Sequence, residues 1–479
     1  MKLSVLASAL NLPAPAQDPD ITALAYDSRQ VRPGALFAAL DGVHKNGAAF
    51  IAAAIANGAV AILGENAPPA LPVPYLRAPN ARRALAEMSA AFYGQPSRQI
   101  KLLGVTGTNG KTTVAFLLRY LLNALGARAG MLGTIIYAVG GEDIPAPLTT
   151  PESVDFAAYL RQAADAGATH LVAEVSSHAL ANHRVDGNRF AAAVFTNLTR
   201  DHLDYHGTGE NYAAAKRRLF QMLPPDAPAI VNADDAHGEF MVAGLPAPVY
   251  RYGIDSIDDE RDWRATVVAE KITGSELVFQ RANERYPARM PLPGKHNALN
   301  ALAALATLTA LGFDAGAVSA AIENFPGVPG RLERVAVNGK TAFVDYAHTP
   351  DALAQALATL RPLTQGKLWV VFGCGGDRDR GKRPLMAQAA EKYADRIVVT
   401  SDNPRGENPQ AIIDEIAAGF SREVQPVLEP DRAAALALAM QAAQPADVVL
   451  AAGKGHENYQ ILADRRVRFS DREMILCQT

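Results

Sequence analysis

The chain has 479 residues, a length that predicts roughly three domains. Hydrophobic residues make up 49% and charged residues 20% of the chain, which is a globular composition and excludes a disordered protein. The formal net charge of −3 gives no general attraction to nucleic acid or to an anionic membrane, and two cysteines, Cys374 and Cys477, are too few for a disulfide framework. We therefore expect a cytoplasmic protein that binds neither nucleic acid nor membranes. Composition does not decide the oligomeric state, for which we expect a monomer.

The first 17 residues faintly mimic a signal peptide, because a basic residue, an apolar stretch and an Ala-Pro-Ala sequence follow one another. Ser4 and Ser8 interrupt the apolar run. Leu3, Leu6 and Leu10 fall instead on one helical face, so we expect a helix and no removed signal. The chain has no run of about 20 apolar residues, so we expect no transmembrane span.

The first ~95 residues alternate between strand and helix signals. We expect strands over residues 35–40 and 59–63, and helices over residues 47–57 and 80–93. The sequence Gly-Gln-Pro-Ser at 94–97 is typical of a linker between domains.

The most informative segment is the glycine-rich sequence at residues 104–113. An apolar run predicts a strand before it, and leucines at helical spacing predict a helix after it. This combination forms an anion site, because backbone N–H groups and the helix dipole favour phosphate oxygens. We expect Lys111 to reach the β- and γ-phosphates and the Thr112 hydroxyl to contact magnesium. Val105 stands where the general pattern has a glycine, and the alternative is an ordinary glycine turn before a lysine.

Polar clusters follow two further strands that we expect at residues 170–175 and 192–196. Glu174 lies at the end of the first strand, where a carboxylate suits the magnesium ion that Thr112 would contact. Residues 201–206 add further groups able to bind a metal. The alternative for each cluster is a hydrogen-bonded turn without metal.

The rest of this region contains a predicted helix over residues 212–220 that carries Lys216. Taken alone, Lys216 indicates only a basic helix face. A β-rich stretch near residues 263–281 and a long alanine-rich helix after residues 295–297 complete the region.

A glycine- and proline-rich segment at residues 325–330 predicts a second linker. Four strand signals follow at residues 342–345, 368–372, 396–400 and 448–451, and helical segments separate them. This alternation predicts a doubly wound parallel sheet. A polar cluster follows each strand, and ligands of such sheets bind at the carboxyl ends of the strands, so we expect a substrate site there.

The charges in these clusters suit an amino acid with more than one charged end. Arg378 and Arg405 are able to bind carboxylates in a bidentate way. Asp402 and Glu457 are able to accept hydrogen bonds from an ammonium group. Residues 402–405 alone would indicate only a proline turn.

Five motifs occur together in this chain. They are Gly107-Thr108-Asn109-Gly110-Lys111-Thr112-Thr113, Glu174-Val175-Ser176-Ser177-His178, Asp201-His202-Leu203-Asp204, Gly330-Arg331-Leu332-Glu333 and Asp345-Tyr346-Ala347-His348-Thr349-Pro350. In combination they resemble the Mur ligase family, and the resemblance covers essentially the whole chain.

The resemblance implies an α/β protein of three domains. Residues 1–96 would form an N-terminal α/β domain that binds a uridine nucleotide. Residues 97–328 would form a central phosphate-loop, ATPase-like domain with a mostly parallel sheet. Residues 329–479 would form a Rossmann-like, doubly wound domain that binds the added amino acid.

The resemblance also implies the reaction, a step of peptidoglycan precursor synthesis. ATP phosphorylates the D-glutamate side chain of UDP-N-acetylmuramoyl-L-alanyl-D-glutamate, and an amine of meso-2,6-diaminopimelate attacks the acyl phosphate. An amide, ADP and phosphate result. Phosphorylation supplies the leaving group that a carboxylate lacks, and positive charge stabilises the transferring phosphoryl group.

The resemblance further assigns residues to ATP, to magnesium and to catalysis. The ATP contacts would be Gly107, Thr108, Asn109, Gly110, Lys111, Thr112, Thr113, Asn297, Arg331 and Asp345. The metal contacts would be Thr112, Glu174, His202 and Lys216, and the catalytic residues Lys111, Lys216 and His202. Lys216 matches the lysine that this family carbamylates, a change that turns a cation into an anion able to bind a second magnesium ion.

The substrate contacts follow from the same resemblance. Those to the uridine nucleotide and the sugar-peptide would be Ser28, Val43, His44, Lys45, Thr149, Thr150, Ser176, Asn182 and Arg184. Asn182 stands where closely similar enzymes often have glutamine. The diaminopimelate pocket would be Arg378, Asp402, Asn403, Pro404, Arg405, Gly453 and Glu457.

Three alternatives stay open. The first is a lysine-adding ligase of the same family, which residues 402–405 argue against: lysine would leave Arg405 unpaired, at a cost of about 1.5–3 kcal/mol. The second is a folylpolyglutamate-synthase-like ligase, which the uridine match in the first domain disfavours. The third is a regulatory module that binds ATP without ligation, against which Glu174, His202 and Lys216 argue together.

Overall fold

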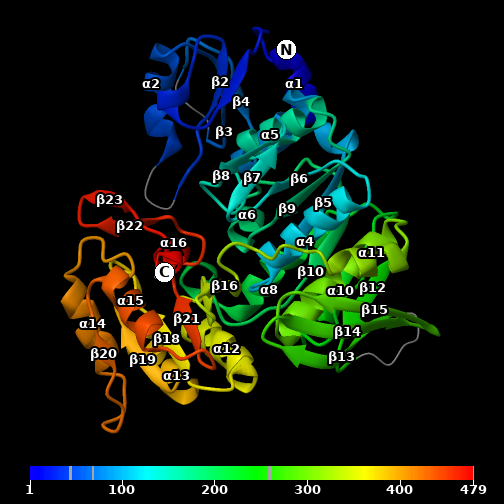
Figure 1. Cartoon of the computed structure of the whole chain (residues 1–479). Helices are drawn as coiled ribbons and strands as arrows, with labels where there is room; N and C mark the ends of the chain where they lie inside the picture. Colours follow the sequence, from blue (N-terminus) through cyan, green and yellow to red (C-terminus); the bar gives the residue numbers. More distant parts are fainter. Residues whose placement is uncertain (43–45, 67–69, 257–261, 478–479) are drawn as a thin grey trace. The chain divides into compact units, whose positions relative to one another are not determined.

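The computed structural model describes residues 1–42, 46–66, 70–256 and 262–477 (Figure 1). They form two compact units. The first is built from residues 1–264, 280–284 and 300–321, and the second from residues 265–279, 285–299 and 322–479. Within the described ranges no helix is long and apolar enough to cross a membrane. The domain boundaries at residues 96 and 328 stay predictions.

The N-terminal part of the first unit is a parallel sheet with the strand order β1-β2-β3-β4. Its elements are α1 (Leu3–Ala9), β1 (Ala23–Ala25), η1 (Ser28–Gln30), β2 (Ala35–Ala38), η2 (Gly47–Phe50), α2 (Ile51–Ala56), β3 (Ala59–Gly64), β4 (Tyr75–Arg77), α3 (Ala81–Phe92) and η3 (Pro96–Arg98). Leu3 and Leu6 are buried, so the predicted N-terminal helix packs into this core. The Asn80 side chain caps α3 by accepting the Arg83 N–H, which explains why the helix begins there.

The central sheet of the first unit has the order β12-β11-β10-β5-β9-β6-β7-β8. Its elements are β5 (Lys101–Thr106), α4 (Lys111–Ala124), β6 (Ala129–Leu132), β7 (Ile136–Val139), β8 (Glu142–Pro145), α5 (Ser153–Asp165), β9 (His170–Glu174), α6 (Ser177–Ala181), β10 (Phe190–Phe195), α7 (Leu203–His206), α8 (Gly209–Gln221), β11 (Ala229–Asn232), α9 (Gly238–Val242) and β12 (Val249–Gly253). The sheet is parallel from β12 to β6, and β7 and β8 extend it in antiparallel fashion. The phosphate-loop strand β5 therefore lies inside the sheet, between β9 and β10, which explains its continuous apolar sequence.

The predicted β-rich stretch and alanine-rich helix are both present. The elements there are β13 (Trp263–Lys271), β14 (Gly274–Arg281), β15 (Glu284–Met290), α10 (Lys295–Ala310) and α11 (Ala315–Ile322). The two predicted linkers are packed segments: Ser97 and Pro96 are buried in the first, and Phe325 and Val328 in the second.

The second unit contains a sheet with the order β16-β17-β21-β18-β19-β20, in which only β16 is antiparallel to its neighbour. Its elements are β16 (Glu333–Val337), β17 (Lys340–Asp345), α12 (Pro350–Leu360), η4 (Arg361–Leu363), β18 (Leu368–Phe372), α13 (Lys382–Tyr393), β19 (Arg396–Val399), α14 (Pro409–Ala417), β20 (Val427–Leu428), α15 (Arg432–Ala442), β21 (Val448–Ala452), β22 (Tyr459–Leu462), β23 (Arg465–Arg468) and α16 (Asp471–Leu476). One apolar core joins the sheet to α12, α13 and α14, and another joins it to α15 and α16. The predicted doubly wound sheet is therefore confirmed, and the carboxyl ends of its five parallel strands share one edge.

Candidate phosphate-loop and ligase site

The phosphate loop occupies the four residues between the end of β5 and the start of α4. Gly110 caps α4 with a left-handed φ of 85°, a conformation that favours glycine. Gly107 passes so close to Thr196 that a Cβ atom would collide with its side chain. Asn197, two residues after the end of β10, holds the loop by accepting Thr108 N–H on its carbonyl oxygen (2.8 Å) and Asn109 N–H on Oδ1 (2.9 Å). The loop and the N-terminus of α4 together make the predicted anion site.

Two lysines meet at one carbonyl of this loop. Lys111 Nζ donates to the Gly107 and Thr108 oxygens, each at 2.8 Å, and Lys216 Nζ donates to the same Gly107 oxygen at 2.8 Å. Lys216 is only 1% exposed. Burial, followed by the nearby Lys111 charge, holds the pKa of Lys216 well below its usual value. Lys216 therefore favours the neutral, nucleophilic amine far more than a surface lysine does.

Glu174 and Thr112 form the metal-capable part of the site. Glu174 is fully buried, and its Oε2 atom accepts hydrogen bonds from the Thr112 and Thr134 hydroxyls, each at 2.9 Å. A hydroxyl and a carboxylate next to the phosphate loop are hard oxygen donors, so this donor set fits magnesium. Within the described ranges, no group of three or more His, Cys, Asp or Glu side chains forms a metal centre. Magnesium commonly takes one or two protein oxygen ligands and completes its shell with phosphate oxygens and waters.

His202 lies in a cluster of aromatic and histidine rings next to the phosphate loop. Its ring lies 4.8 Å from the His178 ring and 6.0 Å from the Tyr212 ring, measured between centroids. The centroid of the Tyr212 ring lies 4.4 Å from Lys216 Nζ, and the Tyr212 hydroxyl lies 3.1 Å from Thr108 Oγ1. Tyr212 thus links His202 and Lys216 to the phosphate loop. Sequence analysis missed this role, although its position four residues before Lys216 on α8 was the available signal.

The predicted sugar-peptide contacts gather after β9. Thr150 donates from Oγ1 to the Glu174 carbonyl oxygen at 2.8 Å and accepts the Ser176 N–H at 3.1 Å. Arg184 donates to the Thr150 carbonyl oxygen at 3.1 Å. Thr149 Oγ1 lies 3.2 Å from Thr134 Oγ1, the hydroxyl that also binds Glu174.

Asn182 lies beside this group at the end of α6. Its Nδ2 atom donates to the Tyr205 hydroxyl at 2.7 Å and to the His178 carbonyl oxygen at 2.9 Å. These two bonds fix the orientation of the Asn182 side chain.

Of the expected uridine contacts, Ser28 lies within the described residues. Ser28 begins η1, just after β1, and its carbonyl oxygen accepts the Asn57 Nδ2–H at 2.9 Å. Val43, His44 and Lys45 lie outside the described residues.

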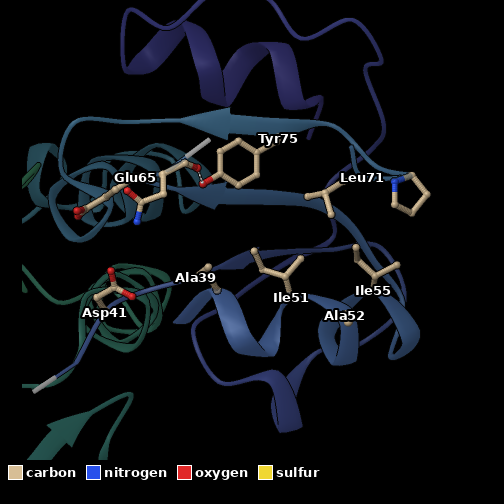
Figure 2. Close-up of a pocket in the computed structure, with 11 residues that line it drawn as sticks. Ala39, Asp41, Ile51, Ala52, Ile55, Glu65, Leu71 and Tyr75 are labelled. Carbon is tan, nitrogen blue, oxygen red and sulfur yellow. Dashed lines mark hydrogen bonds between the residues drawn. The ribbon is translucent and has the colours of Figure 1, made fainter. Parts of the chain in front are cut away.

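A cavity of about 490 Å³ lies between α2 and residues at the end of β3 and the start of β4 (Figure 2). It is lined by Ala39, Asp41, Ala48, Ile51, Ala52, Ile55, Glu65, Asn66, Leu71, Pro72 and Tyr75. Ile51 and Ile55 of α2 lie across from Tyr75, and Asp41 and Glu65 follow β2 and β3. Sequence analysis missed this cavity, although strand ends were the signal for it.

Three residues assigned to the adenosine part of ATP lie in the second unit. Asp345 ends β17, and its two oxygens accept backbone N–H groups from Leu332 (2.7 Å) and Ala347 (2.8 Å). Burial raises the pKa of Asp345, against the opposing charge of Arg331. The Arg331 guanidinium lies 4.7 Å from the Tyr346 ring centroid, and the buried Asn297 amide donates to the Pro293 oxygen at 2.7 Å.

The predicted amino-acid pocket gathers at the ends of β19 and β21. Asn403 Nδ2 donates to Glu457 Oε2 at 2.9 Å. The fully buried Lys454 Nζ donates to the same Glu457 oxygen at 3.0 Å and to Asn403 Oδ1 at 3.2 Å. Gly453 passes so close to Asp402 that a Cβ atom would lie 2.8 Å from Oδ2. Burial raises the pKa of Asp402, against the charges of nearby cations. Lys454 is a pocket residue to which sequence analysis assigned no role.

The structure also brings the two predicted arginines together. A Cβ atom on Gly375 would lie 2.7 Å from Arg405 Nη1 and 3.8 Å from Arg378 Cγ, so both side chains border this glycine. Arg405 donates to the Gly376 oxygen at 2.8 Å, and the neighbouring Pro404 is buried in a turn. Two arginine side chains at the carboxyl end of the sheet suit a carboxylate ligand.

A phosphate loop on a mainly parallel sheet, backed by a buried carboxylate and joined to a doubly wound unit with a charged pocket, defines a phosphate-loop nucleotide-binding protein. Three family models match the chain: "Mur ligase family, catalytic domain" over residues 20–93, "Mur ligase middle domain" over 105–308 and "Mur ligase, glutamate ligase domain" over 330–455. The chain belongs to the Mur ligase family, which confirms the family and the fold class predicted from the sequence.

Individual relatives agree with this assignment. The UDP-N-acetylmuramoyl-L-alanyl-D-glutamate–2,6-diaminopimelate ligase of Chlorobaculum tepidum is 46% identical over 466 residues, which cover 95% of this chain and 92% of the relative. A solved structure of a ligase with the same name is 34% identical, with a TM-score of 0.75 and coverage of 100% of this chain and 99% of the other. A folylpolyglutamate synthase of Mycobacterium tuberculosis shares the fold, at 24% identity, a TM-score of 0.63 and coverage of 78% of this chain and 92% of the other.

Proposed function

We propose that this chain is an ATP-dependent ligase that joins meso-2,6-diaminopimelate to the D-glutamate side-chain carboxylate of UDP-N-acetylmuramoyl-L-alanyl-D-glutamate, in peptidoglycan precursor synthesis. The observation that carries this conclusion is the full-length match to ligases of that name. The reaction takes place in the cytoplasm, where the nucleotide substrates are available, and the working form is a monomer.

The reaction proceeds in two displacements. A carboxylate oxygen of D-glutamate attacks the γ-phosphorus of ATP, and the bond from that phosphorus to the β–γ bridging oxygen breaks to release ADP. The amine nitrogen then attacks the acyl carbon, loses a proton, and phosphate departs with the electron pair of the broken C–O bond. The N–H groups at the N-terminus of α4 and the Lys111 ammonium would bind the phosphates and stabilise the charge of the transferring group. Thr112 and Glu174 would hold magnesium, which neutralises phosphate charge when bound.

Lys216 would act as a carbamate. Its neutral amine adds to carbon dioxide with loss of one proton, which gives N6-carboxylysine. The burial of Lys216 and its lowered pKa support this step, because the neutral amine is the form that reacts. The change also places an anion beside the Lys111 ammonium, with which Lys216 shares the Gly107 oxygen, and so adds an attraction. The carbamate, with His202, would hold a second magnesium ion.

The two organic substrates bind at strand ends. Ser28, with residues 43–45, would bind the uridine nucleotide. The cavity beside α2 supports this assignment, because it offers space for a ligand in the same N-terminal part of the chain. The sugar-peptide contacts are Thr149, Thr150, Ser176, Asn182 and Arg184. Arg378 and Arg405 would bind carboxylates of diaminopimelate, and Asp402, Asn403 and Glu457 its ammonium groups.

An omission assay tests the proposed function. Phosphate release from ATP is measured with the purified chain, the UDP-muramoyl dipeptide, meso-diaminopimelate and magnesium. We expect steady release only in the complete mixture. Release that does not require diaminopimelate would contradict ligation, and equal turnover with L-lysine would identify the lysine-adding alternative.

A further inference from the structure

Two loops carry the arginines of the amino-acid pocket, and hydrogen bonds join these loops to each other. We call residues 373–378 and 402–407 the paired loops. Gly376 N–H donates to the Asn403 oxygen at 2.9 Å, and Asp377 N–H donates to Glu407 Oε1 at 2.6 Å. In return, Gly406 N–H donates to Asp377 Oδ2 at 3.0 Å. A shift of one loop would therefore move the other.

Each of the paired loops contains a residue in a costly backbone conformation. Asp377 has a φ of 53° and Arg405 a φ of 51°. Both values lie in the left-handed region, which residues other than glycine rarely adopt. Such conformations persist only where the surrounding structure determines them. The position of Arg405 therefore depends on whatever holds the paired loops.

A buried cation lies beneath both loops. Arg383, on α13, is fully buried, and its guanidinium donates to both Glu407 oxygens, at 2.8 and 3.0 Å. It also donates to the Gly375 oxygen at 3.4 Å and to Glu415 Oε2 on α14 at 2.8 Å. One side chain thus bonds to one member of each paired loop and anchors them to two helices.

We propose that Arg383 is a positioning residue that sets the preference for an amino acid with a second carboxylate. Arg383 holds Glu407, Glu407 holds the Asp377 backbone, and these contacts keep Arg405 beside Gly375 and Arg378. This inference rests on the proposed function, because it names how the amino-acid pocket is held. It adds a residue outside the pocket, and that residue acts through the loops.

The forked geometry explains why arginine is needed at this position. Two parallel N–H bonds to Glu407 fix both the place and the orientation of that carboxylate, whereas the single ammonium of lysine cannot do so. Lysine would keep the positive charge and lose the orientation. The substitution Arg383→Lys therefore separates positioning from simple charge neutralisation.

The test compares kcat and KM for meso-diaminopimelate, L-lysine, ATP and the UDP-muramoyl dipeptide in Arg383→Lys and Glu407→Gln. Glu407→Gln acts on the same contact from the loop side and decides the question if Arg383→Lys does not fold. The matched control is Arg380→Gln, which removes an exposed guanidinium that lies two residues before α13 and pairs with Glu415 of α14.

We expect both variants to raise KM for diaminopimelate and to lower the diaminopimelate-to-lysine ratio of kcat/KM by about tenfold. The KM values for ATP and for the dipeptide should not change. The control Arg380→Gln should have the same kinetic constants as the unmodified chain. Unchanged ratios in both variants would overturn the proposal. An equal loss for every substrate would also overturn it, because it would indicate general destabilisation. An unmodified chain that shows no diaminopimelate-dependent turnover would instead refute the proposed function.

Discussion

Arg405 offers the sharpest perturbation of substrate choice. The substitution Arg405→Asn removes the guanidinium, and asparagine tolerates the left-handed backbone at this position, where φ is 51°. The change therefore tests the side chain without imposing new strain on the loop.

The expected loss in kcat/KM for diaminopimelate follows from the contacts that the Arg405 guanidinium is able to make. Arg405 donates one hydrogen bond to the Gly376 oxygen at 2.8 Å, and its fork is able to pair with a carboxylate. A hydrogen bond to a charged group contributes about 1.5–3 kcal/mol, which corresponds to roughly 10- to 100-fold in kcat/KM. L-lysine has no second carboxylate, so its own kcat/KM should change little.

The assay measures kcat/KM for meso-diaminopimelate and for L-lysine by phosphate release. We predict that Arg405→Asn lowers the diaminopimelate-to-lysine ratio by about 10- to 100-fold. The matched control is Arg422→Asn, which removes an exposed arginine from the same unit. A ratio equal to that of the control, or a parallel loss for both amino acids, would refute the reasoning.

Three further predictions concern the phosphate loop and the contact that holds the paired loops. Crystals grown with bicarbonate near neutral pH should show carbamate density on Lys216, and a bare amine at full occupancy would count against the modification. Glu174→Gln should raise the magnesium concentration for half-maximal rate by about tenfold, and an unchanged requirement would show that this carboxylate does not serve the metal. Hydrogen bonds from Arg383 lower the pKa of Glu407 from 4.5 to about 2, so its contribution to folding is complete above pH 4.5 and is lost as the pH falls toward 2. The difference in Tm between the unmodified chain and Glu407→Gln should therefore shrink over that interval, and a constant difference would contradict this linkage.

The features that local sequence determines were predictable. The strand before residue 104 and the helix after residue 111 follow from apolar periodicity, and both are present as β5 and α4. The polar clusters after β17, β18, β19 and β21 were also located correctly, because parallel strands must present their carboxyl ends at one edge.

Features that depend on packing between distant segments were not predictable. Arg383 lies in a helix whose sequence gives no sign that its guanidinium is fully buried against Glu407 and Glu415. Tyr212 acquires its role only when α8 lies beside the phosphate loop, and the N-terminal cavity forms only when α2 packs near the segment between β3 and β4. The depressed pKa of Lys216 likewise follows from burial, which the basic helix face did not indicate.

The transfer of the γ-phosphoryl group to a carboxylate is the centre of this account, and an oxygen label tests it most directly. The UDP-muramoyl dipeptide is prepared with ¹⁸O in the D-glutamate side-chain carboxylate, and the phosphate released in the complete reaction is analysed by mass spectrometry. An acyl phosphate predicts that each phosphate carries one labelled oxygen, because the attacking carboxylate oxygen leaves with the phosphorus. Unlabelled phosphate would contradict the mechanism, since ATP would then have been hydrolysed by water.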